Sequence, residues 1–220
     1  MICKTAELLD LTKTKAAPLL AGAEYPWEVL DKLRNFILEL GQTLPEEEYD
    51  HPQPDVWIAK DALIFGSASI KGPCIIGHGT EVRHCAFIRG SALVGDSCVV
   101  GNSTELKNVI LFDGVQVPHF NYIGDSVLGY KAHMGAGAIT SNVKSDKTDV
   151  AVKDGDECLA TGRRKLGAVL GDFVEVGCNS VLNPGTVIGR NTNIYPLSSV
   201  RGVIPSDSIY KTGGETVKKR

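Results

Sequence analysis

Aliphatic residues recur at every sixth position over two long stretches of the chain. Nine of them follow this spacing without a gap from Ile58 to Leu106, and six more do so from Leu170 to Val200. A period of six is neither the 3.6 of a helix nor the plain 2 of a strand. It is expected where short strands are joined by regular corners and each flat side points one aliphatic side chain inward. The positions are Ile58, Ile64, Ile70, Ile76, Val82, Ile88, Val94, Val100 and Leu106, then Leu170, Val176, Leu182, Ile188, Ile194 and Val200.

Three such sides make one coil of 18 residues, and successive coils would stack at the inter-strand spacing of about 4.8 Å. A single coil cannot bury its apolar side alone, so stacking has to supply the core. The pattern therefore predicts an all-β fold, a parallel β-helix over residues 51–205. The spacing does not determine the handedness of the coil, because right-handed crossovers are the general rule for parallel strands.

The repeat is interrupted between the two runs. Its phase slips by one residue at Leu111 and again at Leu128. Residues 143–165 then abandon the pattern and are rich in Lys, Asp and Gly. We expect them to form a long loop outside the stack, and such loops on a rigid scaffold are usually functional or disordered.

The two ends of the chain lack the repeat. Within residues 1–50, Pro26 stands where a helix would begin and Gly41 where it would end. This predicts an amphipathic helix that covers the open end of the stack. Residues 206–220 end in the basic run ETVKKR and are expected to be a solvated tail. The apolar positions at helical spacing are Trp27, Leu30, Leu33, Ile37 and Leu40.

Composition narrows the class of protein. Hydrophobic residues make up 43% and charged residues 22%, as in ordinary soluble domains. A net charge of −3 gives no global attraction to nucleic acid, so an anion site would have to be local. The six cysteines include no C-x-x-C pair and are expected to be reduced, mostly buried side chains. No leader or long apolar run is present, which favours a cytoplasmic protein with no membrane partner.

Three cations form a column in the predicted stack. Lys71, Arg89 and Lys107 recur at an interval of one full coil, and each follows an inward aliphatic residue. Like charges opposite each other on neighbouring strands are destabilising, so the column indicates a site for an anion such as phosphate. A solvated basic edge that discourages aggregation explains it equally well.

His119 and Tyr122 lie just past the first phase slip. A lone histidine is more often structural than catalytic. His119 nevertheless falls near the coil that carries Lys107, where the regular stacking is perturbed, and this makes it a candidate for chemistry.

The segment Phe87–Asn142 contains H-x-x-Y-x-G-D followed by G-A-G-x-I-T-x-N. It resembles the acetyltransferase domain of the bifunctional glucosamine-1-phosphate acetyltransferase/N-acetylglucosamine-1-phosphate uridylyltransferase family, and Gly162–Gly189 is closer to the archaeal sugar-phosphate nucleotidyltransferase/acetyltransferase version. The resemblance implies a left-handed β-helix, acetyl-CoA as co-substrate, and a homotrimer with coenzyme at the subunit boundaries. The family's nucleotidyltransferase domain has no counterpart, because no G-x-G-T-R loop occurs.

The resemblance also implies an N-acetyltransferase mechanism on an amino-sugar phosphate. His119 would be the general base for direct attack of the amine on the thioester, and Asn142 would hold the substrate and the tetrahedral intermediate. A positioned base and an oxyanion donor suffice for this reaction. The implied binding residues are Arg89 and Lys107 for the sugar phosphate, Tyr122 for the substrate, and Ala136 and Cys178 for the coenzyme.

Two other functions compete with this one. A zinc carbonic anhydrase needs three histidines, two of them about five residues apart, but Gly124 stands five residues beyond His119, so no metal is expected. A non-catalytic sugar-phosphate or sugar-nucleotide binding or scaffold protein of the same fold is the other alternative. It is favoured by Val143 and His133, which stand where the family has tyrosine and asparagine.

Overall fold

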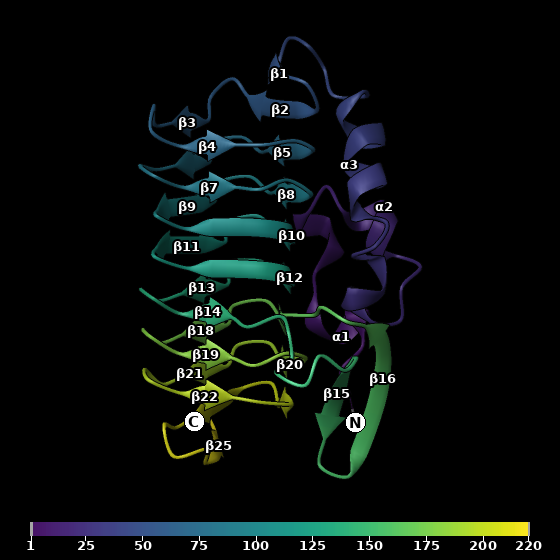
Figure 1. Cartoon of the computed structure of the whole chain (residues 1–220), viewed down its shortest axis with the longest axis vertical. Helices are drawn as coiled ribbons and strands as arrows, with labels where there is room; N and C mark the ends of the chain where they lie inside the picture. Colours follow the sequence, from purple (N-terminus) through teal and green to yellow (C-terminus); the bar gives the residue numbers. More distant parts are fainter. Residues whose placement is uncertain (1, 220) are drawn as a thin grey trace.

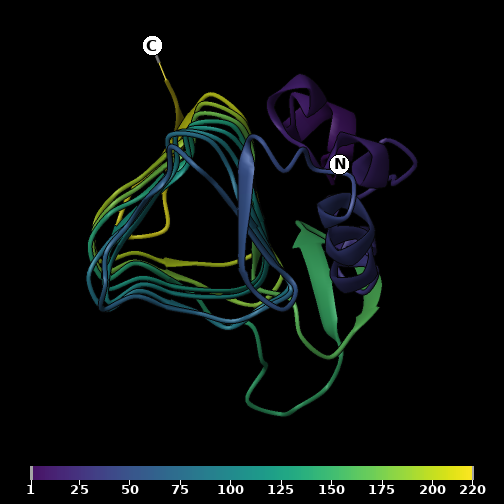
Figure 2. The same ribbon diagram turned by 90° about the horizontal axis from the view of Figure 1, so that it is seen from above.

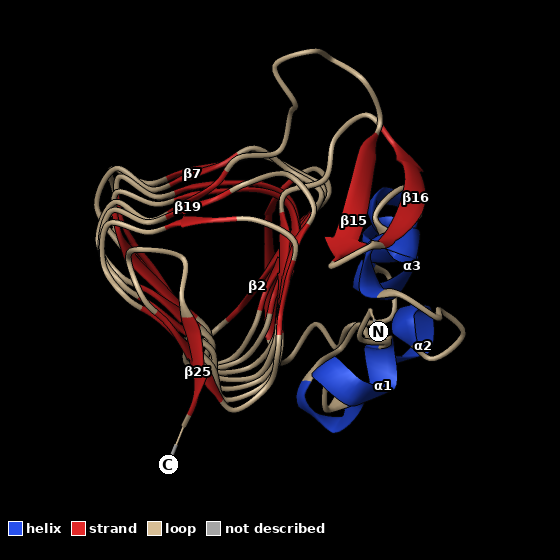
Figure 3. Cartoon of the chain, turned by 90° about the horizontal axis from the view of Figure 1, so that it is seen from below, coloured by secondary structure: helices blue, strands red, loops and turns tan. Residues whose placement is uncertain are grey.

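The computed structural model describes residues 2–219 and forms a triangular prism of stacked coils, with helices and a hairpin along one side (Figures 1 and 2). In the first coil, β2 (Val56–Ala59) lies on a first face, β3 (Leu63–Ile64) on a second and β4 (Ser69–Ile70) on a third. The chain then returns to the first face as β5 (Cys74–Ile76), which pairs in parallel with β2. The coils wind left-handed when followed end-on (Figure 3). The predicted left-handed parallel β-helix is confirmed.

Two long strands, β10 (Glu105–Leu111) and β12 (Tyr122–Leu128), cross from the third face to the first. The remaining strands belong to single faces. The first face adds β8 (Ala92–Val94), β17 (Ala168–Leu170), β20 (Thr186–Ile188) and β23 (Val203–Ile204). The second adds β6 (Glu81–Val82), β9 (Val99–Asn102), β11 (Gln116–His119), β13 (His133–Met134), β18 (Glu175–Val176), β21 (Asn193–Ile194) and β24 (Ser208–Tyr210). The third adds β7 (Phe87–Ile88), β14 (Ile139–Thr140), β19 (Val181–Leu182) and β22 (Ser199–Val200).

The predicted inward aliphatic residues form the core of the stack. All of them from Ile76 onward are buried, whereas Ile58, Ile64 and Ile70 are half-buried because they lie in the first coil. The phase slips are also real. Leu106 pairs with Ile123, one position earlier than the regular period requires, so the slips mark coils that are shorter by a single residue.

The cysteines divide between the core and the surface. Burial raises the pKa of both Cys74 and Cys98 to about 12, as expected for small apolar core residues. Cys85 and Cys178 are exposed, so their expected burial is wrong. They occupy corners of the coil, where side chains point away from the core.

Residues 143–165 are not the unstructured loop that was predicted. They contain β15 (Val150–Asp154) and β16 (Glu157–Arg163), an antiparallel hairpin that turns at Gly155. Val150 and Val152 are buried, so one side of the hairpin contributes to the core. The alternation of these valines with an adjacent Asp-Gly turn is a hairpin signal.

The N-terminal segment lies along the first face, so the predicted position over the open end is wrong (Figures 1 and 3). The predicted helix is present in two pieces, η2 (Pro26–Val29) and α3 (Leu33–Gly41). Helix α3 contacts β5, β8 and β10, and η2 contacts β12. The elements are α1 (Thr5–Leu8), η1 (Leu11–Lys13), α2 (Ala17–Leu20), η2 (Pro26–Val29) and α3 (Leu33–Gly41), followed by β1 (Tyr49–Gln53), which pairs with β2.

The C-terminal segment is part of the stack and not a solvated tail. Strand β24 pairs in parallel with β21, and β25 (Thr216–Lys218) folds back antiparallel onto β24. The segment is ordered because the backbones of β24 and β25 form hydrogen bonds at the last coil. Met1 and Arg220, which end the predicted terminal segments, lie outside the described residues. No helix within residues 2–219 is long and apolar enough to cross a membrane.

Candidate functional site

The cation column lies on the third face, with its members in successive coils. The backbone amide of Lys71 bonds to the Ile88 carbonyl in the next coil, and the amide of Arg89 bonds likewise to the Leu106 carbonyl. Neighbouring carboxylates partly balance the charges of Arg89 and Lys107. Arg89 Nη1 lies 2.7 Å from Glu105 Oε1, a contact that raises the pKa of the guanidinium. Lys107 Nζ lies 3.4 Å from Asp125 Oδ2, a longer contact that an incoming anion can replace.

Asp125 is the centre of a polar cluster at the corner between the third and first faces. Only 3% of it is exposed. Its carboxylate accepts hydrogen bonds from Asn142 Nδ2 at 2.6 Å and Asn108 Nδ2 at 2.8 Å, besides its contact with Lys107. A buried carboxylate needs this degree of satisfaction. Asp125 therefore fixes three side chains at once.

Tyr122 joins this cluster through Asn142. The Asn142 Nδ2 atom donates to the Tyr122 hydroxyl at 3.2 Å as well as to Asp125. Burial raises the pKa of the Tyr122 hydroxyl, so it stays protonated at neutral pH. Since Nδ2 is engaged by both groups, the side-chain oxygen Oδ1 of Asn142 is left available as an acceptor. Three predicted site residues, Lys107, Tyr122 and Asn142, are thus brought together.

His119 is the last residue of β11 and lies at the other edge of the third face, at the corner between the second and third faces. Its side chain is exposed and makes no hydrogen bond or ion pair with the residues that the structure describes. Ala136 and Cys178 occupy the same corner in the next two coils. The Gly137 amide donates to the His119 carbonyl at 3.0 Å, and the Asn179 amide donates to the Ala136 carbonyl at 2.8 Å.

Apart from Arg89, which pairs with Glu105, the predicted site residues therefore fall into two groups on one face. The His119 edge, defined as His119, Ala136 and Cys178, borders the third face on one side. The Asp125 cluster, defined as Asp125, Lys107, Asn108, Tyr122 and Asn142, borders it on the other. About three residues of extended strand separate the two edges, roughly 10 Å.

A cleft adjoins the Asp125 cluster where the hairpin rejoins the stack. It encloses about 300 Å³ between Asn108, Asp125 and residues 162–165. Arg163 is held by Asp31 at 2.7 Å, whereas Arg164 and Lys165 are exposed. The segment that follows the hairpin therefore contributes positive charge to this cleft.

Two functional candidates were missed at the level of sequence. Asp125 stands in the H-x-x-Y-x-G-D motif and lies 18 residues beyond Lys107, but as an anion it does not extend the run of cations. Asn108 directly follows Lys107 and carried no signal of its own.

The other histidines lie apart from one another. His84 Nδ1 is 3.0 Å from the Ser67 hydroxyl, and His133 Nδ1 is 2.7 Å from Glu175 Oε2. Within residues 2–219 no group of three or more His, Cys, Asp or Glu side chains is arranged to hold a metal ion.

Comparison with known proteins identifies related sequences. The family model described as the GMPPB C-terminal domain matches residues 70–188. The bifunctional sugar-1-phosphate nucleotidylyltransferase/acetyltransferase of Sulfurisphaera tokodaii is 38% identical over 90 residues, which are 41% of this chain and 22% of that protein. The bifunctional protein GlmU of Methanococcus maripaludis is 32% identical over 115 residues, 52% of this chain and 28% of the relative. The chain thus spans about a quarter of the length of these relatives.

Among solved structures, the acetyltransferase domain of PglB from Neisseria gonorrhoeae, in complex with acetyl coenzyme A, is similar at a TM-score of 0.39 and 17% identity. The match covers 71% of this chain and 54% of that one.

Proposed function

This chain belongs to the GMPPB C-terminal domain family, and we propose that it transfers the acetyl group of acetyl-CoA to the amine of an amino-sugar phosphate. The observation that carries the proposal is the third face, where the Asp125 cluster and an unpartnered histidine border one surface. The names of two relatives, a nucleotidylyltransferase/acetyltransferase and a bifunctional GlmU protein, point the same way.

In the proposed reaction His119 is the general base. The substrate amine attacks the thioester carbonyl carbon, and the imidazole of His119 accepts the proton that the amine loses. Collapse of the tetrahedral intermediate breaks the carbon–sulfur bond, and the leaving thiolate takes the proton back. An exposed imidazole with no partner among the described side chains is free to act in this way.

Asn142 positions the substrate through its carbonyl oxygen. Its amide nitrogen is engaged by Tyr122 and Asp125, so the available Oδ1 atom accepts a hydrogen bond from a sugar hydroxyl or the amine. The arrangement favours substrate orientation as the main role of Asn142, ahead of donation to the oxyanion.

The coenzyme is proposed to run along the His119 edge. The residues that follow His119 along this edge of the stack are small. Gly135, Ala136 and Gly137 lie in one coil, and Cys178 lies in the next. Small side chains leave room for the thioester to approach the imidazole.

Lys107 and Arg89 are proposed to bind the substrate phosphate. Lys107→Ala is expected to raise KM for the sugar phosphate about 10-fold and to leave kcat within about 3-fold, because a charge-assisted phosphate contact is present in ground and transition states alike. Steady-state kinetics at fixed acetyl-CoA would measure this. Lys131→Ala, which removes a lysine that lies over the Tyr130 ring, is the control and should change neither constant. A fall in kcat with unchanged KM would contradict the assignment.

We also propose a homotrimer, an assembly of three copies of the 23.5 kDa chain. The N-terminal segment and the hairpin cover the first face, so a neighbour has the second and third faces available (Figure 2). Phe120 and Leu197 are 62% and 70% exposed at the corner that carries the His119 edge, and such apolar side chains favour an interface there.

Light scattering at micromolar concentration is expected to give the trimer mass, and Phe120→Asp is expected to lower it. Lys32→Glu, on the helical segment over the first face, should leave the mass unchanged. A monomeric wild-type chain would refute the assembly without touching the proposed chemistry.

The activity itself is tested by mixing the chain with acetyl-CoA and a panel of amino-sugar phosphates. Because Cys85, Cys158 and Cys178 are exposed and would react with thiol reagents, the acetylated product should be followed by mass spectrometry. Product that depends on the sugar supports the proposal. Tight sugar-phosphate binding without acetyl transfer to any amino sugar would favour the binding or scaffold alternative.

A further inference from the structure

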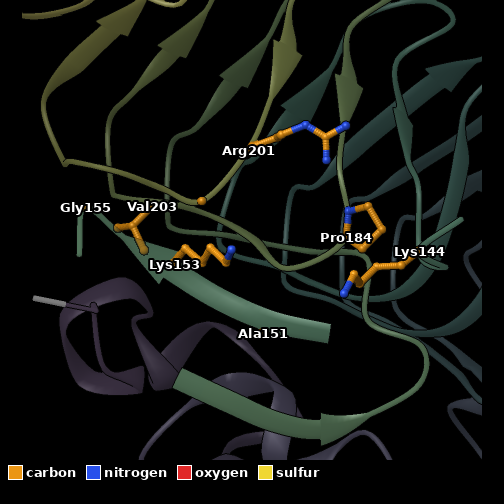
Figure 4. A pocket seen from close by; sticks show the side chains of 8 residues that line it. Lys144, Ala151, Lys153, Gly155, Pro184, Arg201 and Val203 are labelled. Atoms are coloured by element: carbon orange, nitrogen blue, oxygen red, sulfur yellow. The ribbon is translucent and has the colours of Figure 1, made fainter. Parts of the chain in front are cut away.

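A second cleft lies between the hairpin and the later coils. It encloses about 400 Å³ and is bordered by strand β15 on one side and the third-to-first corner of the stack on the other (Figure 4). Its cationic lining residues are Lys144, Lys153 and Arg201, which come from three separate segments of the chain. Its apolar lining residues are Ala151, Pro184 and Val203.

Glycines fix the hairpin against the stack at this point. Gly202 has a φ of +73°, and a Cβ there would lie 2.6 Å from the Lys153 carbonyl oxygen. Gly185 has a φ of +80°, and a Cβ there would lie 2.9 Å from the Ala151 carbonyl oxygen. Only glycine allows both the backbone conformation and this close approach. The backbone of strand β15 therefore lies directly against the stack at Gly185 and Gly202, and this contact forms one wall of the cleft.

The cleft carries positive charge that the protein leaves largely unbalanced. Lys153 and Arg201 are exposed and form no ion pair with any residue in the described range 2–219. Lys144 lies 3.5 Å from Asp146 and donates to Thr148, both on its own loop. None of the lining residues is acidic. A chain with a net charge of −3 thus gathers three cations around one cavity. Such a concentration of like charge is stabilised by an anionic ligand.

We propose that this cleft binds the diphosphate group of a nucleotide. The lysine ammonium groups and the Arg201 guanidinium supply the donors that phosphate oxygens accept. The cavity lies within the 300–1,000 Å³ typical of sites for small organic ligands, and is roomier than one phosphate requires. Ala151, Pro184 and Val203 offer an apolar surface for a base or ribose. The inference goes beyond acetyl transfer, because none of the three cations belongs to the His119 edge or the Asp125 cluster.

Titration calorimetry with inorganic diphosphate, ADP and UDP tests the proposal without any turnover. Saturable binding is expected to the wild-type chain, strongest at low salt. Lys153→Ala and Arg201→Ala should each weaken it about 10-fold, the usual effect of removing one charge-assisted contact. Lys153→Arg keeps the charge and should bind within about 3-fold of wild type. Lys32→Ala, which removes an exposed lysine on the helical segment, is the matched control and should bind as wild type does.

Two outcomes identify the source of the diphosphate, and both support the proposal. Preference for ADP, with competition by coenzyme A, assigns the cleft to a coenzyme. Preference for UDP assigns it to a sugar nucleotide. The proposal is overturned if no nucleotide binds saturably, or if binding persists undiminished in the Lys153→Ala/Arg201→Ala double variant. Either of these failures leaves the proposed acetyl transfer untouched, because its own assay measures product.

Discussion

His119→Ala is expected to lower kcat for acetyl transfer by about 10²–10⁴-fold, with KM for the sugar phosphate nearly unchanged. The proposed phosphate contacts lie in and beside the Asp125 cluster, across the third face, so the loss of the imidazole removes only proton transfer. Steady-state kinetics across a pH series would measure both effects. Wild-type activity should fall as the pH is lowered, because a protonated imidazole cannot accept the amine proton.

His84→Ala is the matched control for this variant. His84 occupies the same corner two coils earlier, since the Ser103 amide bonds to the His84 carbonyl and the Phe120 amide bonds to the Asn102 carbonyl. It is also exposed, and its ring contacts Ser67 and the Phe65 ring at the surface. We expect wild-type kinetics from it. An active His119→Ala enzyme with an unaltered pH profile would rule out His119 as the base.

Gly101→Ala is expected to lower the free energy of unfolding by about 3 kcal/mol, the upper end of the range for overpacking a core. A Cβ at Gly101 would lie 1.6 Å from the carbonyl oxygen of Pro118 and 2.0 Å from its carbonyl carbon. These are backbone atoms of the next coil, so no side chain can move away to relieve the clash. For a chain of this size the loss corresponds to a fall in Tm of about 6–12 °C. Thermal and denaturant unfolding would both report it.

Gly66→Ala provides the comparison, because Gly66 lies at the same corner in the first coil, one position beyond the counterpart of Gly101, and has nothing within 4 Å of its added Cβ. Its free energy of unfolding should change by less than about 0.5 kcal/mol. Equal stability of the two variants would mean that the coils containing Gly101 and Pro118 are not in close contact.

The core of the stack could be predicted from spacing alone, because each inward position depends only on a local period. The face of the stack against which the helices pack could not be predicted from this spacing. It depends on the outward residues of the first face, where Ile75, Leu93 and Ile110 are buried on strands that helix α3 contacts. Each stands next to an inward aliphatic residue, and consecutive apolar residues in a strand indicate burial on both sides. These outward residues lie outside the six-residue period, so that period does not indicate their burial.

The candidate site was predictable to the extent that its residues lie in a contiguous motif. Tyr122 and Asn142 were found by resemblance, and Lys107 by its place in the column of cations. Asp125 was not found, because its importance comes from contacts across coils. Asn142 and Lys107 each reach it from a neighbouring coil, so the cluster depends on the register that the shortened coils impose.

The N-terminal segment changes how the stack can come apart. In a solenoid whose coils touch only their neighbours, the ends fray one repeat at a time. Here Lys15 pairs with Asp96 in an early coil at 2.6 Å, while the Asp10 amide donates to Asp172, in a much later coil, at 2.8 Å. Coils that never meet directly are thereby linked through one short stretch of chain. Loss of an early coil releases contacts that also hold a later one, which makes unfolding a cooperative event of the whole molecule.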